Sequence, residues 1–140
     1  MKIKKGPGTR VPGRLRNWAV PIGCGLLFLF LLKSVLFVGY VPSASMEPTI
    51  RAGSLIFGFR ISEKLECGDV IVFKHEGLLL VKRIAGRPSD VVYADGEMLT
   101  VPADCYYVLG DNADASIDSR DWAEPFVFAS DIIAKVYIRG

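Results

Sequence analysis

The sequence predicts a small, mainly β domain of short antiparallel strands, tethered by one N-terminal transmembrane helix. One apolar run at residues 18–40 contains a single charge in 23 positions, and helical periodicity is hard to find after it. The remainder shows short β-type runs separated by turn signals, at residues 54–60, 70–75, 78–84, 91–93, 97–101, 106–109 and 132–138. About 100 residues of this kind suffice for one modest core.

The apolar run from Trp18 to Tyr40 is the predicted transmembrane helix. At ~1.5 Å per residue it spans ~34 Å, enough to cross a bilayer, and its terminal aromatic rings suit the interface. Residues 1–40 carry seven basic residues and no acidic one. We therefore expect a single-pass protein of the cell membrane, with residues 1–17 as a basic cytoplasmic tail and residues 41–140 as an extracytoplasmic domain.

The N-terminal segment has two alternative interpretations. A basic arm also suits nucleic acid, but this arm adjoins an apolar segment, so we expect the lipid bilayer and not nucleic acid as its partner. A cleaved secretory signal would have a shorter apolar region. Its only plausible cut, after Ala44, would place Pro42 at the −3 position and would split a serine motif.

That serine motif is the run PSASMEPT at residues 42–49, just past the apolar segment. Its simplest interpretation is a polar juxtamembrane turn. A serine hydroxyl is a poor nucleophile until a neighbouring group removes its proton, and a rigid turn suits both a nucleophile and its oxyanion donors. Ser43 and Ser45 are therefore candidates for catalysis, and we expect the apolar Met46 to face lipid or substrate.

Lys82 is the candidate base, because it lies in the apolar stretch LLLVKRIA at residues 78–85. A lysine base working near neutrality needs its pKa lowered by ~3 units from ~10.4, and burial against apolar neighbours has that effect. The alternative is an edge-strand lysine that blocks aggregation. The single histidine, His75, would be needed for a serine–histidine arrangement, but its predicted position in a turn favours an exposed histidine.

The segment LGDNADASIDSR at residues 109–120 is rich in acids, amides and hydroxyls. It does not fit an EF-hand calcium loop, since no glycine occupies the sixth position and no glutamate the twelfth. The sequence predicts no metal and no other cofactor. The segment is either a polar turn or a support loop, whose hydroxyls would hold Lys82 and whose Asp118–Arg120 pair would fix its shape.

Together these segments resemble the conserved boxes of bacterial type I signal peptidases, membrane-anchored serine–lysine proteases that remove signal peptides. The resemblance covers most of residues 18–140, in order, and implies a signal-peptidase-like fold for the β domain. The matching boxes are residues 42–49 for the nucleophile, GDVIVF at 68–73 for the next strand, KRIAGRP at 82–88 for the lysine, and GDN at 110–112 with SIDSR at 116–120 for the last.

The resemblance implies that Ser45 is the nucleophile and Lys82 its general base, with the Ser43 hydroxyl and the Ser45 N–H as the oxyanion hole. The implied enzyme is a monomeric serine endopeptidase that cleaves signal peptides from exported preproteins through an acyl-enzyme. The implied supporting roles are Ser116 orienting Lys82, Asp118 pairing with Arg120 beneath the site, and Met46 lying near substrate and membrane.

Some features depart from the family pattern. Alanine or serine replaces the usual residue at Ser89, Ala113, Ala115 and Ala134. The chain is short, which implies that the accessory β-domain of many members is missing. A specialised peptidase for one secreted or pilin-like partner therefore stays open, as does a non-catalytic assembly factor of the same fold. Whether Cys67 pairs with Cys105 is not decided by the sequence.

Overall fold

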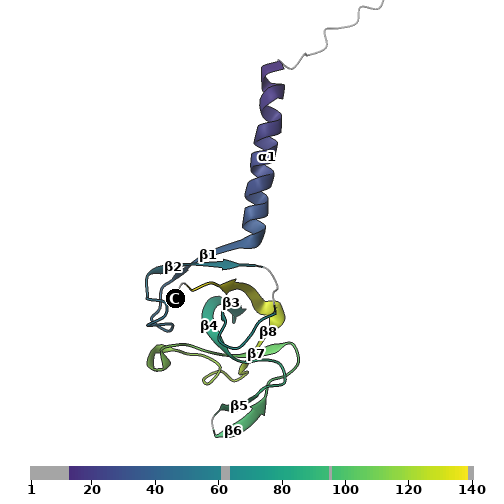
Figure 1. The fold of residues 1–140 in the computed structure, drawn as a ribbon. Coiled ribbons are helices and arrows are strands. Elements are labelled where there is room, and N and C mark those ends of the chain that lie inside the picture. The colour runs from purple at the N-terminus through teal and green to yellow at the C-terminus, as the bar shows by residue number, and fades with distance from the viewer. Residues whose placement is uncertain (1–12, 61–63, 95, 139–140) are drawn as a thin grey trace, which may run out of the picture. The chain divides into compact units, whose positions relative to one another are not determined.

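Residues 13–60, 64–94 and 96–138 are described by a computed structural model of the chain (Figure 1). The chain divides into two compact units, a helical one that ends at Ser34 and a β unit that begins at Val35. This architecture confirms the predicted class, a mainly antiparallel β domain with one N-terminal apolar helix.

Helix α1 runs from Gly13 to Val35, and its segment Trp18–Val35 is long and apolar enough to cross a membrane. The predicted helix, residues 18–40, begins and ends later in the sequence than α1. Residues 13–17 of the predicted tail belong to α1, and residues 1–12 lie outside the described part of the chain.

The end of the predicted transmembrane segment is strand β1, Leu36–Val41, which pairs antiparallel with β2, Ser54–Phe59. Along β1 burial follows the two-residue period of a strand, because Phe37 and Val41 are buried while Val38 and Tyr40 are exposed. The sequence stays apolar across the boundary between α1 and β1, and so composition alone placed the end of the helix too late.

Seven strands form one sheet in the order β1-β2-β9-β3-β4-β7-β8, and every pairing in it is antiparallel. The hairpin of β5 and β6 forms a separate two-stranded sheet. The sequence predicted most of these strands but missed β1 and β8. Their bounds are β3 Val70–His75, β4 Leu78–Gly86, β5 Val91–Ala94, β6 Glu97–Thr100, β7 Cys105–Leu109, β8 Phe126–Phe128 and β9 Ile132–Val136.

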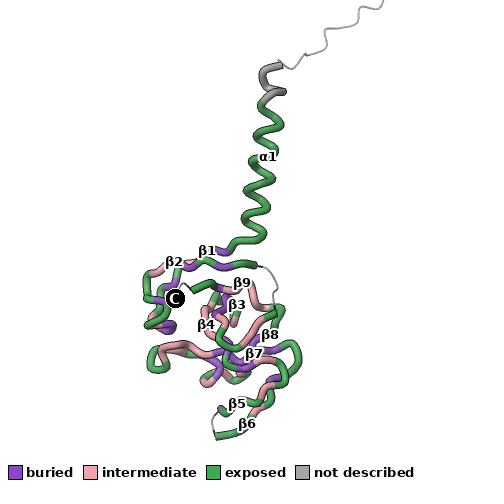
Figure 2. The backbone as a smooth tube through the Cα atoms, in the orientation of Figure 1, coloured by how far each residue is buried: buried purple, intermediate pink, exposed green. Residues whose placement is uncertain are grey.

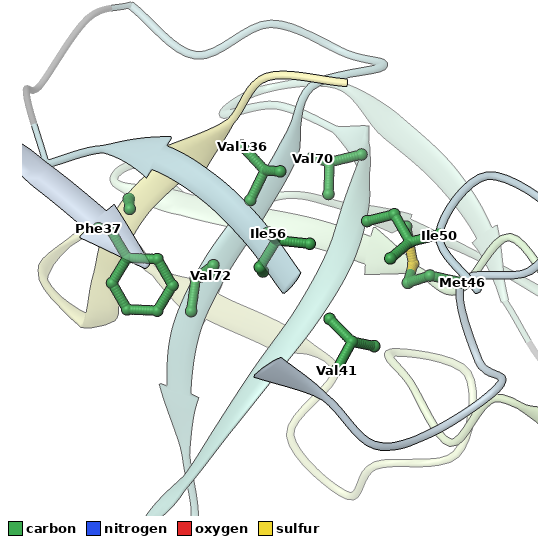
Figure 3. Packing of buried hydrophobic residues seen from close by; sticks show 9 residues of the cluster. Phe37, Val41, Met46, Ile50, Ile56, Val70, Val72 and Val136 are labelled. Atoms are coloured by element: carbon green, nitrogen blue, oxygen red, sulfur yellow. The ribbon is translucent and has the colours of Figure 1, made fainter. Parts of the chain in front are cut away.

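Strand β3 lies at the centre of the core, because it is buried on both faces (Figure 2). Val70 and Val72 belong to one apolar cluster, shown in Figure 3, while Ile71 and Phe73 belong to a second cluster on the opposite face. Two buried faces explain why this strand reads as a continuous apolar run in the sequence.

Candidate active site

The turn at residues 42–49, called the nucleophile turn after the predicted role of Ser45, connects β1 to β2 and is held against the core by Met46. The Met46 side chain is 0% exposed and packs in the same cluster as Val41 and Ile50 (Figure 3). The expectation that this side chain faces lipid or substrate therefore does not hold. An apolar residue in a polar turn is buried here because the turn folds back onto the core, and this places Ser45, the preceding residue, firmly.

Ser45 is itself largely buried, with 8% of its surface exposed, and its Oγ lies 3.2 Å from the Oγ of Ser43. Both serines line a cavity of about 390 Å³. Lys82 lines the same cavity, together with the first half of β4 and with Ala115 and Ile117. The structure thus brings the predicted nucleophile, the predicted base and the second serine to one cavity.

Lys82 is 3% exposed, and its Nζ donates a 2.8 Å hydrogen bond to Ser116 Oγ. Burial lowers the pKa of this ammonium below its usual value, and the Arg120 guanidinium contributes in the same direction. The Asp118 carboxylate opposes the shift and is outweighed. A lysine in this environment gives up its proton more readily than one in water, as a general base must.

Ser116 connects Lys82 to a buried carboxylate. Its hydroxyl donates to Asp118 Oδ2 at 2.6 Å, so it is left to accept from Lys82 Nζ at 2.8 Å. Although burial alone raises the pKa of Asp118, hydrogen bonds from Arg120, Gly110 and Ser116 hold it well below the ordinary value. Asp118 is therefore a permanent anion, and it fixes the direction of the Ser116 hydroxyl.

Arg120 completes this chain of contacts by donating from Nε and Nη2 to the two Asp118 oxygens, at 2.9 and 2.8 Å. Two parallel bonds of this kind define an orientation as well as a charge. The predicted Asp118–Arg120 pair is present in the structure, directly behind the Ser116 hydroxyl.

Arg83 and Asp111 form a second ion pair, which the sequence did not reveal. Arg83 donates to the two Asp111 oxygens at 2.7 and 2.6 Å and to the Gly68 carbonyl at 2.6 Å. Because successive side chains of a strand point to opposite faces, Arg83 reaches this pair while Lys82 enters the cavity. Both charges lie within matching boxes, at 82–88 and 110–112, but no local pattern in the sequence pairs one with the other.

The segment Gly110–Asn112 lies directly against the nucleophile turn. A Cβ added to Gly110 would meet Ser116 Oγ at 2.1 Å and the Ser45 carbonyl oxygen at 2.6 Å, so only glycine fits there. The main-chain N–H of Asn112 donates to that same carbonyl at 3.0 Å, and its side-chain Nδ2 donates to Ala44 O at 3.1 Å.

His75 lies elsewhere in the domain. Its ring stacks on Trp122 with centroids 3.9 Å apart, and it lines a different cavity, together with Glu76 and Glu124. The alternative with a histidine base therefore gains no support from the geometry. The calcium interpretation of the loop gains none either, since the Asp111 and Asp118 carboxylates are engaged by arginines.

Of the four departures from the family pattern, Ala115 lines the cavity that contains Ser45 and Lys82, and the other three do not. Ala113 and Ala115 begin and end a short 3₁₀ turn and are exposed, and Ala134 packs in the core. Ser89 is exposed and adopts a φ of 71°, the left-handed region that favours glycine. Cys67 and Cys105 are free thiols, as is Cys24.

A family model described as "Signal peptidase, peptidase S26" matches residues 15–101 and 95–139. The chain belongs to this family. Membership confirms the resemblance seen in the sequence boxes, and it agrees with the serine and lysine found at one cavity.

Individual members of the signal peptidase family match as well. A probable signal peptidase I-2 of Synechocystis sp. is 32% identical, over 71% of this chain and 61% of that protein. A signal peptidase I of Bacillus amyloliquefaciens is 30% identical, over 75% and 77%, and the signal peptidase I S of Bacillus subtilis is 25% identical, over 75% and 78%. The chain thus spans about three fifths of the length of the first relative and about three quarters of the others.

Proposed function

We propose that this chain is a membrane-bound signal peptidase I, a serine endopeptidase that cleaves signal peptides from exported preproteins with a Ser45–Lys82 dyad. The observation that carries the proposal is the buried Lys82, which is hydrogen-bonded to Ser116 and lines one cavity with Ser45. Family membership supports the same activity.

The proposed reaction assigns one role to each of these groups. Neutral Lys82 takes the proton of the Ser45 hydroxyl as Oγ bonds to the scissile carbonyl carbon. The resulting oxyanion accepts hydrogen bonds from the Ser45 N–H and the Ser43 hydroxyl. Lys82 then protonates the leaving amine as the C–N bond breaks. It next deprotonates a water molecule that hydrolyses the acyl-enzyme, and the proton finally returns to Ser45.

The first half of β4 is the proposed docking edge for the substrate. In the described chain, β3 pairs with β4 from Leu78 onward, whereas β7 pairs with β4 only from Arg83. Residues 78–82 therefore have one free edge, and they line the cavity that contains Ser45. An extended cleavage segment can add to such an edge as a strand, with small side chains entering a shallow apolar pocket.

A second surface supports action at a bilayer. The outward side chains of β1 and β2 are apolar and exposed: Leu36, Val38, Tyr40, Leu55, Phe57 and Phe59. An exposed apolar face of this extent is typical of contact with lipid or with a partner. With α1 in the membrane and the basic N-terminus in the cytoplasm, the catalytic domain would be extracytoplasmic. We propose that the enzyme acts as a monomer.

The test is cleavage of a preprotein by the purified full-length chain. Ser45→Ala and Lys82→Ala should each abolish cleavage, whereas Lys74→Ala, which removes an exposed lysine from β3, should leave it unchanged. His75→Ala should also remain active. Full activity of either dyad variant would overturn the proposal. A panel of unrelated preproteins separates a general signal peptidase from one that serves a single partner.

A further inference from the structure

The Ala44–Ser45 peptide group has two ends with different tasks. Its N–H is the proposed main-chain donor to the oxyanion, and its carbonyl oxygen, Ala44 O, points away from that donor. A trans peptide is planar, with the N–H and the C=O directed oppositely. Whatever holds Ala44 O in place therefore sets the direction of the Ser45 N–H.

Asn112 is the residue that holds this carbonyl from outside the turn. Its side-chain Nδ2 donates to Ala44 O at 3.1 Å, and the same oxygen accepts a local bond from the Glu47 N–H at 3.1 Å. The main-chain N–H of Asn112 also donates to Ser45 O at 3.0 Å. One residue from the distant Gly110–Arg120 loop thus binds the carbonyl on each side of the nucleophile.

These contacts affect the donor in two ways. Two hydrogen bonds on Ala44 O restrict rotation of the peptide plane, so the Ser45 N–H does not need to reorient when charge develops. Hydrogen bonds to a carbonyl also polarise its peptide group and strengthen the N–H at the other end. Both effects are larger in the transition state than in the bound substrate, because only the transition state carries the full oxyanion.

We propose that Asn112 is a positioning residue that aims the Ser45 N–H at the oxyanion of the tetrahedral intermediate. This inference rests on the proposed function. It assigns Asn112 to the oxyanion side of the site, whereas Ser116, Asp118 and Arg120 serve the base. Its loss should therefore weaken transition-state stabilisation and leave the ionisation of Lys82 unchanged.

The first measurement is the steady-state kinetics of Asn112→Ala in the full-length chain. We expect kcat to fall roughly 10- to 100-fold, which does not exceed the effect of removing a whole oxyanion donor. KM should change by no more than about twofold. The midpoint of the pH–rate profile should not move. Asp114→Ala, an exposed change in the same loop, is the matched control and should behave as the unmodified chain.

A peptide aldehyde provides a readout that a purely structural defect would not reproduce. It adds reversibly to Ser45, and its hemiacetal oxygen occupies the oxyanion position. Asn112→Ala should weaken binding of the aldehyde by about the same factor as kcat/KM, while binding of the cleaved product peptide stays unchanged. Asn112→Asp, which places a carboxylate oxygen against Ala44 O, should weaken binding of the aldehyde at least as much as Asn112→Ala does.

Unchanged aldehyde affinity in Asn112→Ala, or equal losses for aldehyde and product peptide, would overturn the inference. If Asn112→Ala does not fold, the same comparison in Asn112→Ser decides, because serine keeps a polar side chain in the loop but lacks the Nδ2 donor to Ala44 O. Full activity of Ser45→Ala would instead overturn the proposed function itself. An inactive Ser45→Ala combined with a normal Asn112→Ala would refute only the role of Asn112.

Discussion

Lys82 Nζ lies 2.8 Å from Ser116 Oγ, and these two groups are 34 residues apart in the sequence. The hydrogen bond directs the ammonium of a buried lysine, which has few other polar neighbours on its apolar strand. Ser116 is in turn held by the anionic Asp118, so the orientation of the base depends on a hydroxyl whose own direction is fixed.

Ser116→Ala should therefore impair the base without removing it. We expect kcat to fall roughly 10- to 1000-fold, less than the ~10²–10⁴-fold that a positioned acid–base group itself contributes, with KM nearly unchanged. Steady-state kinetics on a preprotein substrate measure this. Ser130→Ala, an exposed serine-to-alanine change, is the control, and an equal loss in both variants would contradict the assigned role of Ser116.

The rate of cleavage should rise with pH as Lys82 loses its proton. Since burial lowers the Lys82 pKa, the midpoint of this rise should lie below 10.5, the value for an unperturbed lysine. The Asp118 charge raises that pKa, so Asp118→Asn should move the midpoint to lower pH while reducing the plateau rate. A pH–rate profile of both proteins tests this. An unchanged midpoint would show that the two charges are not coupled, and a midpoint that moves to higher pH would contradict the sign of the coupling.

Ser89→Gly should stabilise the domain. Ser89 adopts a φ of 71°, and a left-handed conformation costs a non-glycine residue ~1–2 kcal/mol. Glycine removes this cost but gains entropy in the unfolded chain, and so we expect a net gain of about 0.5 kcal/mol. Denaturant titration of the free energy of unfolding measures it. The control is Ser130→Gly, which lies in a 3₁₀ turn and should not raise the free energy of unfolding.

Gly110→Ala should abolish activity, because its Cβ would meet Ser116 Oγ at 2.1 Å and Ser45 O at 2.6 Å. One of these atoms must move, and each belongs to a proposed catalytic segment. Cleavage assays combined with circular dichroism separate lost activity from lost fold. Gly23→Ala in α1, where an added Cβ meets nothing within 4 Å, is the matched control. An active Gly110→Ala variant would mean that the loop tolerates displacement.

Much of this architecture was predictable from local patterns. Strands β2, β3 and β4 were predicted at their observed positions because alternation and turn residues are local signals. It did not separate α1 from β1, because apolar residues satisfy a membrane helix and a sheet equally well. The three-residue β8 was too short to produce a pattern.

The site was predictable where a residue type was out of place, as Lys82 is on an apolar strand. Contacts between distant segments were not predictable in the same way. The bonds from Arg83 to Asp111 and from Asn112 to Ala44 join residues that are 28 and 68 positions apart. Met46 was misjudged for a related reason, since only the tertiary fold shows that the turn covers the core.

The loop from Gly110 to Arg120 contacts Ser45 through Asn112 and Lys82 through Ser116, and these are the two proposed reacting residues. A single displacement of this loop would disturb both reacting groups at once. Two substitutions in this loop should therefore reduce activity by less than the sum of their separate effects, because the first change already removes contacts that the second would remove.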